Sequence, residues 1–323
     1  MNKQRKAVIE GFEISEITEV ELGGIRQKIL IEGKTGDLPV VISLHGGPGT
    51  PIPFCAGARG LFPEFTDRCI LVCWDQYGCG INNARLDDDV TISFFVDMTV
   101  DLIKAMKKRF PDNKLYLLAM SWGSVLSARA AVRVPQLLDG VIVYGQVLSG
   151  LMQDKETIDA LMSSRAPAKE KEKIKEALEE KRFDKDTAMR LSKLIRKYTS
   201  GYTDPNEPKA DIGSMILGLM RSPDYRFRDF KAVIINGYAK NSSLIEELSK
   251  VDLSDTLRDI AVPYRILQGS SDIVTNTSKL CSFVKSSGNK FLSCSVVDNC
   301  AHIPGMNGMK AVLDEIAGLN PVS

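Results

Sequence analysis

The sequence predicts an α/β protein whose central, mostly parallel sheet is flanked by helices. Short, continuous apolar segments recur in its first half, at residues 38–44, 69–74, 114–120 and 138–148. Segments of this kind are typical of parallel strands, because such strands are buried on both faces. Helical patterns separate the later ones, and this alternation is typical of a parallel sheet. Strand character stops near residue 149 and resumes at 264–268 and 291–297, which indicates a helical insertion into one sheet.

The other elements can be assigned in chain order. Residues 11–34 alternate between apolar and polar side chains, which predicts an antiparallel hairpin with one solvated face. Residues 94–110 have helical spacing and end in a basic turn that complements the helix dipole. A second helix, rich in small residues, is expected at 121–134, and a last helix at 309–319.

The insertion, residues 149–255, contains amphipathic helical stretches and no strand signal. In one stretch, 169–181, Glu170 and Lys173 form an i,i+3 charge pair, which is typical of a solvated helix face. Residues 202–208 include two prolines and several turn formers. We therefore expect a loop there that joins two parts of the insertion.

Composition excludes several classes of protein. The 323 residues include 42 Lys and Arg against 41 Asp and Glu, a net charge of +1, and 44% are hydrophobic. A chain with this balance folds, and it lacks the basic excess that nucleic-acid binding requires. Residues 1–21 contain no apolar run typical of a signal peptide, and no window is apolar enough to span a membrane. We expect a cytoplasmic protein with neither a nucleic-acid nor a membrane partner.

The seven cysteines indicate reduced thiols, because an odd, scattered set is unlike a secreted disulfide framework. Cys69 and Cys73 fall in a predicted buried strand, where buried thiols are the expected state. The chain has two histidines, His45 and His302, and neither has zinc-site spacing from a cysteine pair. The sequence therefore implies no metal and no cofactor.

Ser121 is the predicted nucleophile. The strand 114–120 runs into Ser121-Trp122-Gly123 and then into a helix, which is the context of a nucleophile elbow. Positions two before and two after such a serine pass close to neighbouring backbone and must be small. Gly123 meets this requirement, and Ala119 is the mildest departure from glycine.

A catalytic serine needs a base that is oriented by a carboxylate. His302 follows the last predicted strand, so it should reach the same sheet edge as Ser121. Asp272 follows the strand 264–268 and therefore lies between serine and histidine in chain order, as expected for the acid. Asp298 is the alternative acid, although its position suggests that it shapes the loop before His302.

The tetrahedral intermediate also needs hydrogen-bond donors for its oxyanion. The elbow supplies the N–H of Trp122, and the glycine-rich loop 45–49 can supply a second N–H with no Cβ in the way. The loop lacks the pattern of a phosphate cradle. His45 is interpreted as a structural residue that holds this loop.

At these residues the chain resembles the α/β-hydrolase superfamily and, within it, the proline iminopeptidase-like serine peptidases. Three motifs carry the resemblance, at residues 45–49 (His-Gly-Gly-Pro-Gly), 74–80 (Trp-Asp-Gln-Tyr-Gly-Cys-Gly) and 121–124 (Ser-Trp-Gly-Ser). The chain departs from the family at Ala119 and Met120, where two glycines are usual, and at Tyr77, where arginine is frequent. The resemblance implies a core of residues 1–148 and 256–323, with a helical cap, 149–255, inserted after the sixth strand.

The resemblance also implies an activity, the release of an N-terminal residue, often proline, from a short peptide. It implies that Ser121 attacks, His302 moves the proton, Asp272 orients His302, and Gly47 and Trp122 bind the oxyanion. Cap carboxylates hold the substrate ammonium in this family. Candidates for that role are Glu246 and Glu247.

Two alternatives remain open. A carboxylesterase or lactonase would use the same triad, with an apolar acyl pocket in the cap. Residues that could line such a pocket are Met152, Met162, Met215, Leu217, Leu219 and Met220. A non-catalytic ligand receptor on a hydrolase scaffold is the second alternative, because a fold does not guarantee turnover. Related enzymes that attack with an aspartate are disfavoured by Ser121.

Overall fold

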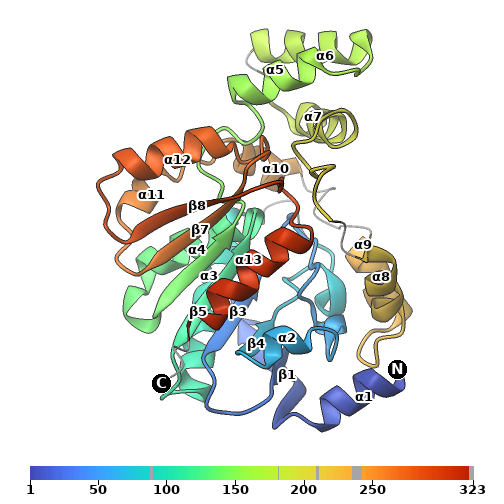
Figure 1. Cartoon of the computed structure of the whole chain (residues 1–323), viewed down its shortest axis with the longest axis vertical. Coiled ribbons are helices and arrows are strands. Elements are labelled where there is room, and N and C mark those ends of the chain that lie inside the picture. The colour runs from blue at the N-terminus through green and yellow to red at the C-terminus, as the bar shows by residue number, and fades with distance from the viewer. Residues whose placement is uncertain (88–89, 181, 209–210, 235–241, 320–323) are drawn as a thin grey trace.

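A computed structural model describes residues 1–87, 90–180, 182–208, 211–234 and 242–319. Within these residues, eight strands form one sheet in the order β1-β2-β4-β3-β5-β6-β7-β8 (Figure 1). The strands are β1 Ile14–Leu22, β2 Ile25–Gly33, β3 Val40–Leu44, β4 Ile70–Cys73, β5 Leu115–Met120, β6 Gly140–Tyr144, β7 Tyr264–Gly269 and β8 Leu292–Val297. β1 pairs antiparallel with β2, and β2 with β4, whereas the other pairs are parallel. The predicted mostly parallel sheet, with a hairpin at its edge, is confirmed.

Helices flank this sheet and form the insertion between β6 and β7. They are α1 Lys3–Glu10, α2 Pro63–Thr66, α3 Ile92–Arg109, α4 Trp122–Arg133, α5 Lys155–Ser163, α6 Ala168–Glu179, α7 Lys185–Tyr198, α8 Ile212–Met220, α9 Phe227–Ile234, α10 Ser242–Ser249, α11 Ser254–Arg258, α12 Thr277–Ser286 and α13 Met306–Ala317. In the described part of the chain, no helix combines the length and the apolar character needed to cross a bilayer.

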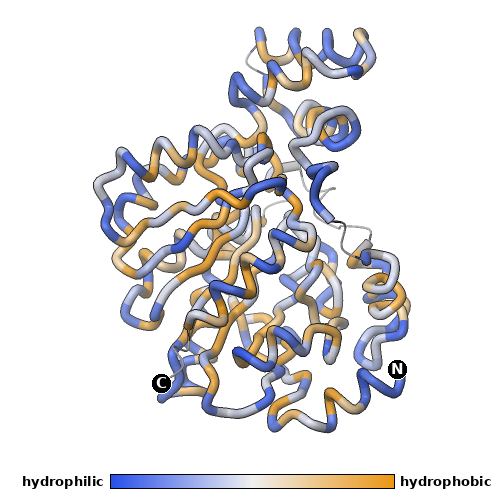
Figure 2. Tube along the Cα trace, in the orientation of Figure 1, coloured by the Kyte–Doolittle hydropathy of each residue, from blue (hydrophilic) through white to orange (hydrophobic). Residues whose placement is uncertain are grey.

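Both faces of the sheet are buried, as continuous apolar strands require. In β3, Val40 and Ile42 belong to one hydrophobic cluster and Val41 to another, because successive side chains point to opposite faces. Helices α3 and α4 cover the first face, and α2 and α13 cover the second. Figure 1 shows α13 crossing in front of the sheet, and Figure 2 shows apolar positions concentrated along the strands. The core therefore lies in two layers, one on each face.

The described chain between β6 and β7 contains helices joined by loops and no strand of the sheet, so the insertion after the sixth strand is confirmed. Helices α5–α7 pack around their own cluster, which includes Leu161, Ile174 and Leu191. Helices α8 and α9 contribute Leu219 and Val233 to a separate cluster. Figure 1 shows α5–α7 above the ends of the strands and α8–α9 to one side. The loop at 202–208 connects these two parts, as its prolines predicted.

Helix α1 was not expected, because half of residues 3–10 are charged. Its Arg5 is nevertheless 5% exposed. The guanidinium donates to the carbonyl of Gly57 (2.6 Å) and to that of Gly218 at the far end of α8 (2.9 Å). One buried arginine therefore joins the N-terminal helix to the segment after β3 and to the insertion.

Candidate active site

Ser121 occupies the tight turn between β5 and α4. Its backbone has φ 49° and ψ −114°, a conformation that residues other than glycine rarely adopt. Its N–H donates to the carbonyl of Tyr144 on neighbouring β6 (3.1 Å). A Cβ at Gly123 would lie 2.0 Å from the carbonyl oxygen of Leu44, so only glycine fits at this position. The turn has the geometry of a nucleophile elbow, which presents the serine Oγ above the sheet.

The structure brings His302 and Asp272 to this serine. His302, after β8, has its Nε2 2.9 Å from Oγ of Ser121. Its Nδ1 lies 3.0 Å from Oδ2 of Asp272, which follows β7. Asp298, the alternative acid, has an exposed side chain. The three residues thus form the hydrogen-bonded chain that nucleophilic serine chemistry requires, in which the base is held by a carboxylate.

Asp272 is fixed as a carboxylate by its surroundings. Oδ1 accepts the N–H groups of Val274 (2.8 Å) and Thr275 (3.0 Å). Oδ2 accepts the hydroxyl of Thr275 (2.6 Å) and the side-chain amide of Gln268 (3.2 Å). Burial works to raise the pKa of Asp272, but the charge of His302 and these hydrogen bonds outweigh it, so the pKa lies below its ordinary value. The group is therefore ionised at neutral pH and can orient His302.

The predicted oxyanion donors, Gly47 and Trp122, flank the serine. Gly46 and Gly47 line the same cavity as Ser121. Gly47 has φ +122°, and a Cβ there would lie 2.6 Å from the nitrogen of Gly49, so the loop requires glycine at this position. The N–H of Trp122 is the first of helix α4 and has no intrahelical acceptor. Both N–H groups therefore belong to segments next to the serine.

Gln76 links the two segments that carry these donors. Its backbone N–H donates to Nε2 of His45 (3.1 Å), and its side-chain carbonyl accepts the indole N–H of Trp122 (2.9 Å). Burial lowers the pKa of His45 to about 4, so the ring is neutral and can accept this hydrogen bond. Nδ1 of His45 contacts the carbonyl of Gly46 (2.9 Å). His45 thus holds the loop, which is the structural role interpreted from the sequence.

A cavity of about 960 Å³ opens over Ser121 and His302. Its size is within the range typical of small-molecule sites. The last turn of α7 and the segment 199–208 form one wall. An apolar wall is formed by Ile52, Pro53, Phe62, Met120, Met215 and Met309. The cavity therefore combines apolar surface with polar groups from the insertion.

Glu207 is the most enclosed charged group of this wall, with a side chain only 6% exposed. Its Oε1 accepts the N–H of Gly308 (3.0 Å) and the thiol of Cys300 (3.1 Å). A Cβ at Gly305 would lie 2.5 Å from Cδ of Glu207, so glycine makes room for the carboxylate. Among the described residues, no cation forms an ion pair with Glu207. Asp204, also buried, lines the same cavity.

Glu246 and Glu247, predicted as amine ligands, do not line this cavity. Glu246 is exposed on α10 and pairs with Lys250 (2.6 Å). Glu247 accepts the N–H of Ile92 (2.7 Å) in the first turn of α3. The prediction is corrected: Glu246 pairs along α10 and Glu247 joins α10 to α3, whereas the loop before α8 brings acidic groups to the cavity that Ser121 lines.

Several site residues were not identified from the sequence. Asp204 and Glu207 lie in the loop 202–208, whose prolines indicated a turn but not the direction of its side chains. Gln268 and Thr275, which donate hydrogen bonds to Asp272, are neutral residues and do not belong to a recognisable sequence motif. A usable signal for Glu207 was its place between two prolines in the insertion, since a rigid loop can hold a carboxylate in a fixed position.

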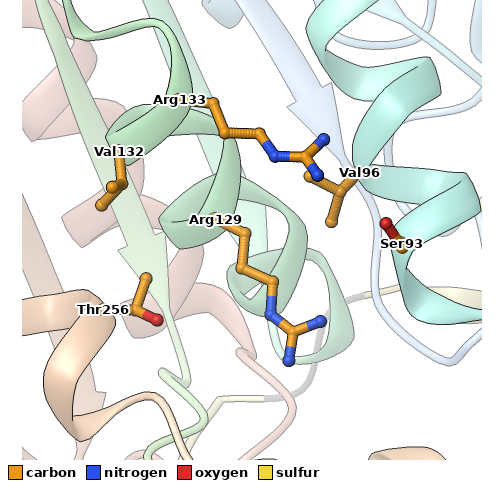
Figure 3. Close-up of a pocket in the computed structure, with 6 residues that line it drawn as sticks. All are labelled: Ser93, Val96, Arg129, Val132, Arg133 and Thr256. Carbon is orange, nitrogen blue, oxygen red and sulfur yellow. The ribbon is translucent and has the colours of Figure 1, made fainter.

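A smaller hollow of about 230 Å³ lies between α3, α4 and α11 (Figure 3). Its lining consists of Ser93, Val96, Arg129, Val132, Arg133 and Thr256. None of the predicted site residues borders it. Within the described ranges, no three His, Cys, Asp or Glu side chains are grouped so that they could hold a metal ion.

The chain belongs to the family of proteins with the alpha/beta hydrolase fold, whose model matches residues 39–308. A "Probable aminopeptidase" of Bacillus subtilis is 30% identical over 146 residues, which span 45% of either chain. A proline iminopeptidase of Thermoplasma volcanium is 26% identical over 250 residues, covering 73% of this chain and 74% of the relative. The crystal structure of a Mycobacterium smegmatis proline iminopeptidase shares the fold, with a TM-score of 0.62, 19% identity and coverage of 94% and 97%.

The family match confirms the predicted α/β-hydrolase fold, and the chain is similar in sequence to proline iminopeptidases, as the resemblance predicted. These similarities also support a hydrolase activity for this chain. The matched share of the Bacillus relative is less than half of its length, so the activity in its name is considered below as a proposal.

Proposed function

We propose that this protein is a serine hydrolase of the proline iminopeptidase type, which releases an N-terminal residue from short peptides. Ser121 Oγ attacks the carbonyl of the first residue while His302 Nε2 takes the hydroxyl proton. Asp272 stabilises the imidazolium that forms, and the N–H groups of Gly47 and Trp122 bind the oxyanion.

This attack forms a tetrahedral intermediate. It collapses when His302 gives the proton to the leaving amine, so the shortened peptide departs and an acyl-enzyme remains. Water then attacks the acyl-enzyme while His302 takes its proton, and His302 returns that proton to Ser121 Oγ as the ester bond breaks and the residue is released. Every proton in this cycle passes through Nε2, which lies 2.9 Å from the serine oxygen.

The observation that supports an amine substrate is the buried, unpaired Glu207 in the same cavity as Ser121. A carboxylate taken out of water is costly unless a cation or several hydrogen bonds compensate it. Its described hydrogen bonds reach one oxygen, Oε1. The ammonium group of a peptide N-terminus supplies the missing positive charge. Asp204 adds a second negative charge, and the apolar wall suits a proline ring.

We propose that residues 149–255 act as the cap over a core of residues 1–148 and 256–323. Helix α7 and the loop 202–208 contribute side chains to the cavity, as a cap that selects substrates does. We also retain the cytoplasm as the proposed location, on the grounds of the scattered, odd set of cysteines.

The esterase alternative is less well supported. Of the six residues suggested for an apolar acyl pocket, only Met215 lines the cavity. Met152 packs within the cluster of α5–α7, Leu219 is fully buried, and Met220 is 58% exposed. An uncharged acyl substrate would also leave Glu207 without a counter-charge.

The test compares wild type with Ser121→Ala and Glu207→Gln on proline p-nitroanilide and on p-nitrophenyl acetate. Ser121→Ala should abolish turnover of both substrates. Glu207→Gln should lower kcat/KM on the proline substrate roughly 10- to 100-fold, the value of one hydrogen bond to a charged group, and reduce it much less on acetate. Glu246→Gln, which changes an exposed carboxylate outside the cavity, is the matched control.

The other possible results of this comparison would each favour an alternative or exclude part of the proposal. Turnover of acetate alone would move the function to an esterase, and activity that survives in Ser121→Ala would exclude the mechanism. Absence of turnover on either substrate would favour the non-catalytic receptor. An equal loss on both substrates in Glu207→Gln would exclude its role as the ammonium ligand.

A further inference from the structure

Two cations in the last turn of α7, Arg196 and Lys197, line the cavity that contains Ser121. The guanidinium carbon of Arg196 lies 5.1 Å from the ring centroid of Tyr202. The ring of Tyr202 in turn packs edge-on against the imidazole of His302, with centroids 5.6 Å apart. The ring of Tyr202 therefore lies between the guanidinium of Arg196 and the imidazole of His302, the proposed base.

Neither cation forms an ion pair with a carboxylate in the described part of the chain. Arg190, on the same helix, does pair with a carboxylate, that of Glu170. The helix dipole favours basic residues in a last turn, but it does not require that they border a cavity or stack on Tyr202. The cavity thus presents unpaired positive charge at α7 and unpaired negative charge at Glu207.

We propose that Arg196 and Lys197 bind the free C-terminal carboxylate of a short peptide whose N-terminal residue lies at Ser121. This inference rests on the proposed aminopeptidase function and names its substrate class. A peptide with both termini free carries an ammonium and a carboxylate, the two charges that match Glu207 and α7. A guanidinium binds a carboxylate through two parallel hydrogen bonds, which suits Arg196 to this role.

The size of the cavity, about 960 Å³, limits how far apart the two charged ends can lie. A long peptide would carry its carboxylate beyond α7 and lose the contact. The substrates are therefore short products of prior peptide-bond hydrolysis, since that reaction leaves a free carboxylate on each fragment. The protein would act at the end of such a sequence of cleavages.

The experiment measures kcat/KM on Pro-Ala, Pro-Ala-Ala and Pro-Ala-Ala-Ala, each as the free acid and as the C-terminal amide. Wild type should prefer the acid roughly tenfold for at least one length, as expected for exposed charge-assisted contacts. The double variant Arg196→Gln with Lys197→Gln should bring this ratio close to one by slowing the acids only. Lys193→Gln, an exposed change on α7 outside the cavity, should keep the wild-type ratio.

Labelling of Ser121 by a fluorophosphonate, measured on the same preparations, shows whether the double variant keeps an intact reactive site. Equal rates on acids and amides in wild type would exclude the proposed carboxylate site. An equal loss on both in a double variant that still reacts with the probe would exclude it as well. Neither result would affect the proposed aminopeptidase function. Failure of wild type to cleave any of the six peptides while it still reacts with the probe would overturn the aminopeptidase function, and this inference with it. Added NaCl should weaken the preference for the acids, because exposed charges are screened.

Discussion

The indole N–H of Trp122 donates to the side-chain carbonyl of Gln76 at 2.9 Å, which ties the helix after Ser121 to the segment after β4. Gln76 also contacts His45 through its backbone N–H (3.1 Å) and, more weakly, through its side-chain amide (3.4 Å). The two segments that supply the proposed oxyanion donors are thus fixed to one residue. Their spacing depends on Gln76 although Gln76 itself does not line the cavity.

Replacing this side chain should therefore slow the chemical step. In Gln76→Met the backbone N–H remains, but the buried indole N–H of Trp122 loses its acceptor. Removing one oxyanion donor lowers kcat by about 100- to 1000-fold in comparable enzymes, so displacement of the donors should cost roughly 10- to 100-fold. The KM for proline p-nitroanilide should change little. Steady-state kinetics on this substrate measure both kcat and KM. A loss of stability with unchanged kcat would show that Gln76 has only a structural role.

Asp272 and Asp298 can be distinguished as the partner of His302. Asp272→Asn keeps the shape of the side chain but places an N–H2 or a neutral oxygen opposite Nδ1, which favours the wrong tautomer. We expect kcat to fall by about 1000- to 10,000-fold. Asp298→Asn, at the exposed alternative position, is the control and should change kcat less than about threefold. Equal effects of the two substitutions would contradict the assignment of Asp272.

Close packing at the elbow should make Gly123 intolerant of any side chain. A Cβ there would meet the carbonyl oxygen of Leu44 at 2.0 Å, so Gly123→Ala must displace β3 or α4. We expect a loss of more than about 3 kcal/mol in the free energy of unfolding, as for other severe core substitutions. Gly213→Ala, at an exposed position of α8, meets no atom closer than 3.5 Å and should be neutral or stabilising by up to about 1 kcal/mol. Urea unfolding of both variants measures the contrast.

Much of the fold could be predicted because the signals are local. Buried strands show as continuous apolar runs, and the elbow shows as a serine between such a run and a helix. The scarcity of histidine left His302 as the one histidine positioned to be the base, and chain order then suggested Asp272. These inferences needed only the rule that carboxyl ends of parallel strands meet at one sheet edge.

The part of the site that the insertion contributes could not be predicted in the same way. Whether a glutamate faces a cavity depends on packing between segments distant in sequence, as for Glu207 against Gly305 and Gly308. In the sequence, Glu247 is as plausible an ammonium ligand as Glu207, but in the structure its carboxylate accepts an N–H from α3. Arg5 shows the same difficulty, because its charge predicts exposure, whereas each of its three guanidinium nitrogens donates to a backbone carbonyl.

Stability should fall in mild acid partly because of His45. Burial lowers the pKa of His45 from 6.5 to about 4, so the folded protein keeps the ring neutral where the unfolded chain takes up a proton. The unfolded state binds more protons between these two values, and stability therefore decreases as the pH falls through this window. The full effect is roughly 3 kcal/mol. Burial has the opposite consequence for Asp75, since its pKa is raised from 3.8 to about 6 and stability is lost as the pH rises.

A difference measurement separates the two groups. In His45→Asn the titration of His45 is absent while that of Asp75 remains, so the contribution of Asp75 cancels when the variant is compared with wild type. At pH 7.5 the variant should be less stable than wild type by about 1–3 kcal/mol, because buried hydrogen bonds to Gly46 and Gln76 are lost. Toward pH 4.5 this gap should shrink by roughly 2–3 kcal/mol as wild type loses the contribution of His45. Urea unfolding at half-unit pH steps measures the gap, and a gap that stays constant across the window would show that His45 does not titrate as its burial requires.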